Sequence, residues 1–366
     1  METTIAEILQ KGNLGRDDII TLLGADESAD IELIRSTAEK LLLDKCGPAV
    51  FYRGLIEFSN LCIRDCLYCG IRKSNAGINR YTLSKEEIVA SAKWCADKGY
   101  GSVVLQSGER QDDAFIDFLV DVISEIKSST ASEKMPGGAG VTLSVGEQSP
   151  AAYKRLYEAG AHRYLLRIES SNPILFASIH PPEQELQRRI DCLKTLRETG
   201  FQVGTGVMIG IPGQTVEVLA DDILFFKEMD IDMIGMGPYI VHSATPMSIY
   251  ADYHKFTRNE IFQTALLMIS VCRIVLGDVN IASTTALQAM RDDGREEGLR
   301  YGANVIMPLT TPLNVRQDYL LYDGKPCLDE DVQQCSACLE KRIRSIGREI
   351  AVDVWGDSKK ALRRQN

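Results

Sequence analysis

Residues 60–70 read NLCIRDCLYCG and hold three cysteines, Cys62, Cys66 and Cys69. Thiolates at this spacing can converge on one inorganic centre. A closed structural zinc site needs four ligands, and no histidine precedes His162, so one coordination position has no local donor. Iron–sulfur clusters are normally held by four cysteines. The loop therefore predicts a cluster with one iron left open to a small molecule, with zinc as the alternative.

This loop follows a strand-like run at residues 54–59, and seven more such runs come after it, with helical segments between them. The later runs lie at 102–106, 141–145, 164–169, 202–209, 232–237, 280–283 and 304–309. Two of the helical segments begin with capping boxes, Ser84 with Glu87 and Thr257 with Glu260. Eight βα units without a linker predict a complete (βα)8 TIM-type barrel, whose reactive groups lie on the loops after the strands.

The segments that flank the predicted barrel divide the chain into three parts. Residues 1–50 look helical and are expected to cap the bottom or the side of the barrel. The barrel itself is expected to span residues 51–312. Residues 313–366 are expected to form a short helical C-terminal extension, which carries a second cluster of cysteines.

Composition and charge narrow the partners and the compartment. The 366 residues carry a net charge of −10, which argues against a general affinity for nucleic acid. The N-terminus has acidic residues where a signal peptide needs basic ones, and the longest apolar stretch, around 265–276, contains Arg273 and is too short to span a membrane. We therefore expect a cytoplasmic protein without a membrane or nucleic-acid partner, and a buried helix at 265–276. Disulfides are rare in that compartment, so clustered cysteines are weighed first as metal ligands.

The first cysteine loop resembles the signature of the radical S-adenosylmethionine (SAM) superfamily, CxxxCxΦC, with Tyr68 at the aromatic position. The context agrees, because the loop follows the first predicted strand. The resemblance implies a 4Fe–4S cluster on Cys62, Cys66 and Cys69, with the amino and carboxylate groups of SAM on the open iron. It also implies that an electron from the reduced cluster cleaves the sulfonium bond of SAM, which gives methionine and a 5′-deoxyadenosyl radical.

A site for SAM needs an acceptor for its ammonium group, a cation for its carboxylate, a partner for its ribose diol and open backbone near its adenine. The acceptor is expected after the second strand, at Ser107, Gly108 and Glu109. This segment resembles the GGEP segment of the superfamily, which receives the ammonium group, although Arg110 replaces the proline.

The other SAM contacts are expected farther along the chain. Glu169 is the candidate for the ribose hydroxyls, and Arg189 is the candidate for the carboxylate; a surface ion pair is the alternative for each. Residues 206–215 resemble the backbone segment that contacts adenine in the superfamily, with Met208 and Gly210 nearest the base. The position of this segment after the fifth strand supports the assignment.

Within the superfamily, the chain resembles the HydE family of [FeFe]-hydrogenase maturases over nearly its whole length after residue 50. The resemblance is carried by residues 56–60, 66–70, 104–109, 163–169, 210–215, 284–285 and 303–308. The family has an accessory iron–sulfur cluster on three late cysteines, which Cys327, Cys335 and Cys338 match here. The accessory cluster is of the 2Fe–2S or the 4Fe–4S type, and a zinc knuckle is the alternative.

The resemblance implies an organometallic substrate, an iron complex with carbonyl, cyanide and cysteine ligands that a partner maturase makes. The adenosyl radical attacks the cysteine sulfur, and the product becomes half of the diiron precursor of the hydrogenase H-cluster. Other maturases and a reductant such as flavodoxin or ferredoxin are then the partners. The matching cavity residues are Arg167, Thr284, Thr285, Tyr319 and, less firmly matched, Tyr322. Strand-end capping for the threonines and core packing for the tyrosines are the alternatives.

Other readings of the same loop remain open. Biotin synthase shares the barrel and the cysteine loop, but its second cluster sits on cysteines inside the barrel, and predicted strands two to eight contain no cysteine here. Methylornithine synthase would act on an amino acid and lacks the late cysteine trio. A non-catalytic iron–sulfur carrier or scaffold would not need Glu169, Arg189 and the segment 206–215 together.

Overall fold

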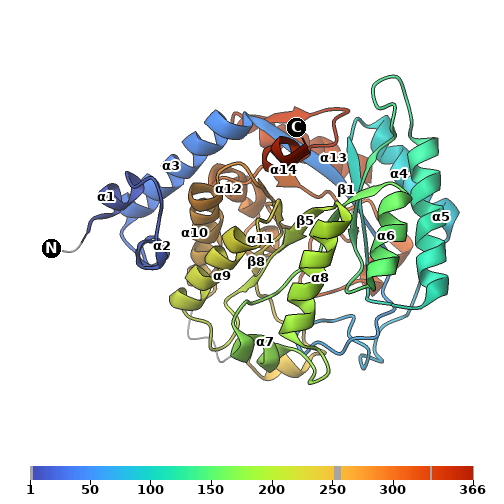
Figure 1. Cartoon of the computed structure of the whole chain (residues 1–366), viewed down its shortest axis with the longest axis horizontal. Coiled ribbons are helices and arrows are strands. Elements are labelled where there is room, and N and C mark those ends of the chain that lie inside the picture. Colours follow the sequence, from blue (N-terminus) through green and yellow to red (C-terminus); the bar gives the residue numbers. More distant parts are fainter. Residues whose placement is uncertain (1–2, 251–256, 330–331, 366) are drawn as a thin grey trace.

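The computed structural model describes residues 3–250, 257–329 and 332–365, without the side chains of Tyr250, of 332–337 and of Gln365. Eight parallel strands form one curled sheet in the order β10-β1-β2-β3-β4-β5-β7-β9 (Figure 1). Their bounds are β1 Ala49–Ser59, β2 Ser102–Ser107, β3 Gly140–Ser144, β4 Ala161–Leu165, β5 Gln202–Thr205, β7 Met233–Ile234, β9 Asn280–Ile281 and β10 Val305–Ile306. The predicted set of eight parallel strands is confirmed.

Five strands are shorter than predicted, including β9 and β10, which keep only two residues each of the runs 280–283 and 304–309. The run 164–169 ends as β4 at Leu165, and Glu169 takes a positive φ of 62°, which a regular strand does not accommodate. The runs 202–209 and 232–237 each divide, and their second halves, β6 (Met208–Ile209) and β8 (Gly237–Pro238), pair with each other in a small separate sheet. Val207 pairs with Glu169 instead, which interrupts the fifth strand. Irregular backbone therefore stands where the predicted SAM residues lie.

Helices cover the outside of the sheet, each with an apolar stripe toward the strands. In α5 the buried residues recur at three- and four-residue spacing: Phe115, Ile116, Leu119, Val122, Ile123 and Ile126. Both predicted capping boxes, at Ser84 and at Thr257, are formed. The helices are α4 Lys85–Asp97, α5 Asp113–Ser129, α6 Pro150–Glu158, α7 Pro173–Ile179, α8 Leu186–Thr199, α9 Val216–Glu228, α10 Arg258–Leu276, α11 Thr285–Met290 and α12 Gly294–Arg300.

Helix α10 is the one described helix whose length and composition would suit a membrane span. Most of it is buried inside the protein, including every residue from Ala265 to Arg273. The Arg273 guanidinium donates to the carbonyl oxygens of Gly302 (2.9 Å) and Val279 (2.8 Å), so the charge in this helix is satisfied by backbone. The predicted buried helix is confirmed.

Three helices precede the first strand: α1 Ile5–Leu9, α2 Arg16–Leu23 and α3 Ser28–Cys46. They pack against α9 and α10, and they stand out to the left of the barrel in Figure 1. Arg16 forms a two-pronged ion pair with Asp221 of α9, at 2.6 and 2.9 Å. Of the two predicted positions for this segment, the side is therefore the observed one.

The C-terminal segment contains η2 Leu313–Asp318, α13 Val332–Ser345, β11 Glu349–Ala351 and α14 Lys359–Gln365. The segment predicted as a helical extension also contains one strand, because β11 joins the sheet in parallel beside β1. Strand β1 begins at Ala49, inside the predicted N-terminal cap, and its first residues extend beyond the start of β2. They leave an edge free, and a short strand from the far end of the chain covers it.

Candidate active site

The three cysteines of the first loop lie directly after β1, and none forms a disulfide. The Cys62 sulfur accepts from the backbone nitrogens of Arg64 (3.4 Å) and Glu109 (3.3 Å). The Cys66 thiol lies 3.5 Å from the side-chain oxygen of Gln184. The loop is thus held against the segments that follow β2 and α7.

An arginine that sequence reasoning did not single out fixes the shape of this loop. The Arg80 guanidinium donates to the carbonyl oxygens of Asn60 (2.6 Å), Ile71 (2.8 Å), Arg72 (2.6 Å), Lys73 (3.3 Å) and Asn75 (3.1 Å). Five carbonyl groups around one planar cation leave the chain little freedom between them. The fixed loop positions its cysteines before any ligand arrives.

The donor chemistry of the loop fits an iron–sulfur cluster. Burial raises the pKa of the Cys66 thiol to about 12, and it also raises the pKa of the Cys69 thiol. A bound metal reverses this, because a coordinating thiol is deprotonated outright. In the described part of the chain, no three His, Cys, Asp or Glu side chains converge closely enough to hold one metal ion. A cluster presents several irons to its thiolates, so its ligands stand farther apart than those of one ion.

Close packing explains Gly108, which the sequence placed in the ammonium-binding segment. A Cβ at this position would lie 2.3 Å from the carbonyl oxygen of Leu61 and 2.7 Å from the Cβ of Cys62. Only glycine allows the two loops to approach this closely. Ser107, just before it, is buried and donates from its hydroxyl to the carbonyl of Gly108 (2.7 Å).

The predicted charged residues are buried, not on the surface. Glu109 receives Arg64 Nε at 2.6 Å, and burial raises its pKa although Arg189 and Arg64 oppose the shift. Arg189 lies 2.7 Å from Glu147, which also receives Arg64 (3.1 Å) and Arg188 (3.0 Å). Glu147 is fully buried after β3 and was missed by sequence reasoning. Its position after a strand end, behind a glycine, was the available signal.

Glu169 contacts one residue predicted to bind SAM and one predicted to bind the substrate. The Tyr68 hydroxyl lies 3.5 Å from one carboxylate oxygen of Glu169, and Arg167 Nη2 lies 3.0 Å from the other. The Tyr68 ring meets His180 edge-on, with centroids 5.6 Å apart. Burial raises the pKa of Glu169, although Arg167 counteracts it. Its left-handed backbone costs about 1–3 kcal/mol, a strain that is typical of functional positions.

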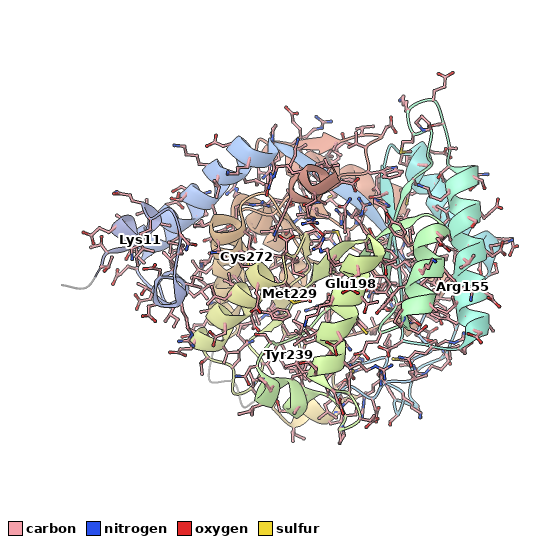
Figure 2. All side chains as sticks on the ribbon, in the orientation of Figure 1. Lys11, Arg155, Glu198, Met229, Tyr239 and Cys272 are labelled. Atoms are coloured by element: carbon pink, nitrogen blue, oxygen red, sulfur yellow. The ribbon has the colours of Figure 1, made fainter. Side chains whose placement is uncertain are left out.

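The segment predicted to contact adenine lies beside the cysteine loop. Met208 packs in one apolar cluster with Ile179 and Tyr239, and Tyr68 borders that cluster. Figure 2 shows Tyr239 toward the end of the molecule that carries α7. Gly210 donates its backbone nitrogen to the side-chain oxygen of Gln214 (2.7 Å). This turn leaves an apolar wall next to the loop of Cys66.

The predicted substrate residues have separate contacts in the structure. The Tyr319 hydroxyl accepts from Gln106 (3.3 Å), and Thr284 begins α11 with a buried hydroxyl that has no partner among the described residues. The Thr285 hydroxyl accepts from Arg295 (2.9 Å). Burial and the charge of Glu57 raise the pKa of Tyr322, and Arg295 and Arg167 act in the opposite direction.

A buried ion pair next to Tyr319 was not predicted. Lys325 lies 2.6 Å from both carboxylate oxygens of Glu57, and it also donates to the carbonyl of Tyr319 (3.0 Å). The partners are 268 residues apart in the chain, and a lone lysine in a loop gives no sequence signal. The pair ties the start of the C-terminal segment to β1.

The second cysteine trio is only partly described. Cys327 is half-buried with a φ of 65°, and its carbonyl accepts from Arg316 (2.9 Å). Cys338 is exposed on α13. The side chain of Cys335 lies outside the described residues, so the accessory cluster stays a prediction.

Comparison with known proteins adds to this geometry. The Radical SAM superfamily model matches residues 56–226. The chain is 40% identical over 359 residues to the [FeFe] hydrogenase maturase subunit HydE of Thermotoga maritima, which covers 98% of each chain. Its fold matches methylornithine synthase with a TM-score of 0.79 (22% identity; 95% of this chain and 97% of that one). It also matches the maturase HydG from Carboxydothermus hydrogenoformans with a TM-score of 0.77 (20% identity; 94% and 79%).

The two structural likenesses show the fold alone, whereas the identity to HydE extends over nearly all of both chains. Membership of the superfamily implies a 4Fe–4S cluster and SAM, for which the loop of Cys62, Cys66 and Cys69 supplies a fitting donor set. The chain therefore belongs to the HydE family of [FeFe] hydrogenase maturases and is a radical SAM enzyme.

Proposed function

We propose that this enzyme acts on an iron complex with carbonyl, cyanide and cysteine ligands during assembly of the hydrogenase H-cluster. The carrying observation is the ion pair between Glu169 and Arg167 (3.0 Å), because it joins the residue assigned to SAM to a residue assigned to the substrate. A short path between the two ligands is what radical transfer requires, since the reacting atoms must be held in contact.

The chain's own residues have separate roles in this proposal. Cys62, Cys66 and Cys69 would hold the cluster, which when bound supplies the electron for reductive cleavage of SAM. Glu109 accepts the SAM ammonium group, and Arg189 faces its carboxylate. Their charges match those of the amino acid part of SAM, and burial strengthens such pairs.

The remaining SAM contacts follow the same chemistry. Glu169 is the acceptor for the ribose hydroxyls, and its left-handed backbone turns the carboxylate toward Tyr68. Met208 and Gly210 lie along the adenine, where an apolar wall and open backbone suit a flat base. Arg167, Thr284, Thr285, Tyr319 and Tyr322 surround the substrate.

We extend the proposal to the architecture and the partners. A complete barrel is supported by a parallel bridge between Ala282 and Val305 and by hydrogen bonds at 2.9 Å from Ser283 to Val305 and from Asn304 to Ile281. These contacts join β9 to β10, the two ends of the sheet order. The division at residues 50 and 312, the accessory cluster, a flavodoxin or ferredoxin reductant and a cytoplasmic site of action belong to the same proposal.

Two measurements test the function. Anaerobically reconstituted, reduced protein is expected to convert SAM to 5′-deoxyadenosine and methionine, and failure to do so would remove the SAM-cleaving activity from the proposal. A hydrogenase assembly system is then run with and without this protein. Activation is expected only with it; activation that does not depend on it would favour an amino acid substrate, as in methylornithine synthase.

A further inference from the structure

Helix α12 is pressed against the loop that carries the predicted substrate threonines. A Cβ on Gly294 would lie 2.1 Å from the carbonyl oxygen of Leu287, and a Cβ on Gly298, one turn later, would lie 2.2 Å from the Ser283 hydroxyl. Both contacts require glycine. The Ser283 hydroxyl in turn donates to the carbonyl of Arg295 (2.8 Å). The spacing of the two glycines therefore fixes Arg295 beside the end of β9.

The Arg295 side chain is a buried cation with few partners. It is 2% exposed, and one of its nitrogens, Nη2, donates to the Thr285 hydroxyl (2.9 Å). Its Nε atom is buried without a hydrogen-bond partner. Among the described residues, no carboxylate lies within ion-pair distance of this guanidinium. A buried charge without a counter-charge is destabilising unless a ligand of opposite charge joins it.

Three other buried arginines each have two or more hydrogen-bond partners within the protein, although Nη2 of Arg163 is also buried without one. Arg163 pairs with Asp357 (2.5 Å), and Arg273 donates to backbone carbonyls at 2.8 and 2.9 Å. Arg316 donates to the carbonyls of Thr311 (2.7 Å) and Cys327 (2.9 Å). Arg295 differs from these structural arginines, because a single threonine hydroxyl is its hydrogen-bond partner in the described structure.

The surroundings of Arg295 suit an anion. The buried hydroxyl of Thr284, the residue before the Thr285 that Arg295 contacts, also has no partner among the described residues. Arg167 and Arg295 both lower the pKa of Tyr322, so both cations lie within electrostatic range of its hydroxyl. Two carboxylates of this region already have cationic partners: Glu57 pairs with Lys325 (2.6 Å), and Glu169 pairs with Arg167 (3.0 Å).

We propose that Arg295 is a substrate-binding residue that takes the carboxylate of an amino-acid-bearing substrate, with Thr285 held in place by the same guanidinium. Arginine suits this role because its planar fork matches a carboxylate. The inference rests on the proposed function in one respect: there the amino acid is the cysteine ligand of the iron complex.

The test pairs a change in the protein with a change in the ligand. Reconstituted wild-type protein and Arg295→Gln are given the iron carbonyl cyanide complex made with L-cysteine or with L-cysteine methyl ester, which lacks the carboxylate charge. The wild type is expected to prefer the acid by about tenfold in KM, and Arg295→Gln to raise the KM for the acid by about tenfold and lose the preference. Substrate-free SAM cleavage should not change, which also reports a folded variant.

Two further variants sharpen this test. Arg295→Lys should fall between wild type and Arg295→Gln, because it keeps the charge and loses the fork. Arg300→Gln, on the same helix but half exposed and near Glu297, should behave as wild type. A variant Arg295→Gln that still prefers the acid would overturn the inference and leave the proposed function standing.

A wild type that uses neither complex would overturn the proposed function, and Arg295 is then tested alone. Calorimetry would compare the binding of L-cysteine and its methyl ester to wild type and to Arg295→Gln. Tighter binding of the acid to wild type alone would support the carboxylate site. Equal or absent binding in the two proteins would overturn it.

Discussion

The two ends of the strands differ in how completely their buried charges are paired. At the end where the strands begin, Arg163 is fully buried and donates to Asp357 (2.5 Å), to the Thr142 hydroxyl (2.9 Å) and to the carbonyl of Trp355 (2.9 Å). Asp357 and Trp355 belong to the C-terminal segment, whose helix α14 lies over this part of the barrel in Figure 1. At this end the chain supplies its own counter-charges.

At the end where the strands finish, the charges are matched incompletely. Glu147 and Glu109 share three arginines, and Arg295 has no acidic partner among the described residues. Buried charges therefore stabilise the fold at the first end and are available to a ligand at the second. Substitutions at the first end should change the free energy of unfolding, whereas substitutions at the second should change ligand binding and turnover.

The largest expected effect is at the cysteine loop. Cys62→Ala should abolish SAM cleavage in reconstituted protein, because the cluster would lose one of three thiolates. Cys335→Ala, in the other trio, should largely spare cleavage. 5′-Deoxyadenosine formation measures both, and iron content checks the loading of each variant. Equal loss from the two variants would contradict the division into catalytic and accessory cysteines.

The next effect is at the opposite end. Asp357→Asn leaves Arg163 buried without its counter-charge and should lower the free energy of unfolding by about 3 kcal/mol. Urea denaturation of the cluster-free protein measures this loss. Asp221→Asn is the matched control: its ion pair with Arg16 is 45% exposed on each side, so it should cost less than about 1 kcal/mol. Similar losses from both variants would remove the special role of the buried pair.

The sequence predicted the elements whose signals are local. The capping boxes at Ser84 and Thr257 and the eight strand-like runs depend on neighbouring residues, and the structure forms them. Strand β11 depends on an edge left free by β1, about 300 residues earlier in the chain. Its three residues have only a modest strand preference, so the sequence alone does not predict this pairing. The positive φ of Glu169, inside the predicted run 164–169, is likewise a feature that composition does not reveal.

The site divides in the same way. The cysteine loop and the residues at strand ends could be located because their spacing carries the chemistry. Arg80, Glu147 and Arg295 could not be distinguished from solvated surface charges, which most arginines and glutamates are. Burial separates them, and burial is a tertiary property: Glu147 lies among arginines up to 83 residues away in the chain.

A smaller effect is expected when the charge network at the functional end is opened. Glu147→Ala removes the partner that orients Arg189, Arg188 and Arg64, and it should raise the KM for SAM about tenfold. Glu147→Gln keeps hydrogen-bond acceptors and should recover part of the loss. Glu158→Gln, an exposed glutamate of α6, is the control. A change in stability with an unaltered KM would place Glu147 with the structural charges of the other end.

The last effect concerns pH at the end where the strands begin. Burial lowers the pKa of His162 to about 4, below the value near 6.5 of an unfolded histidine. The folded protein therefore favours the neutral ring, so the stability from this site is present above pH 6.5 and is lost as the pH falls toward 4. The pKa shift of His162 limits the loss of unfolding free energy to about 3 kcal/mol. Partial exposure of the ring reduces the expected loss to about 2 kcal/mol. His162→Gln can still hydrogen-bond to Asp357 but has no proton to gain, so its unfolding free energy should fall less steeply between pH 7 and pH 4. Parallel curves for the two proteins would mean that the buried charges at this end are not coupled to His162, and the contrast between the two ends would then rest on Arg163 and Asp357 alone.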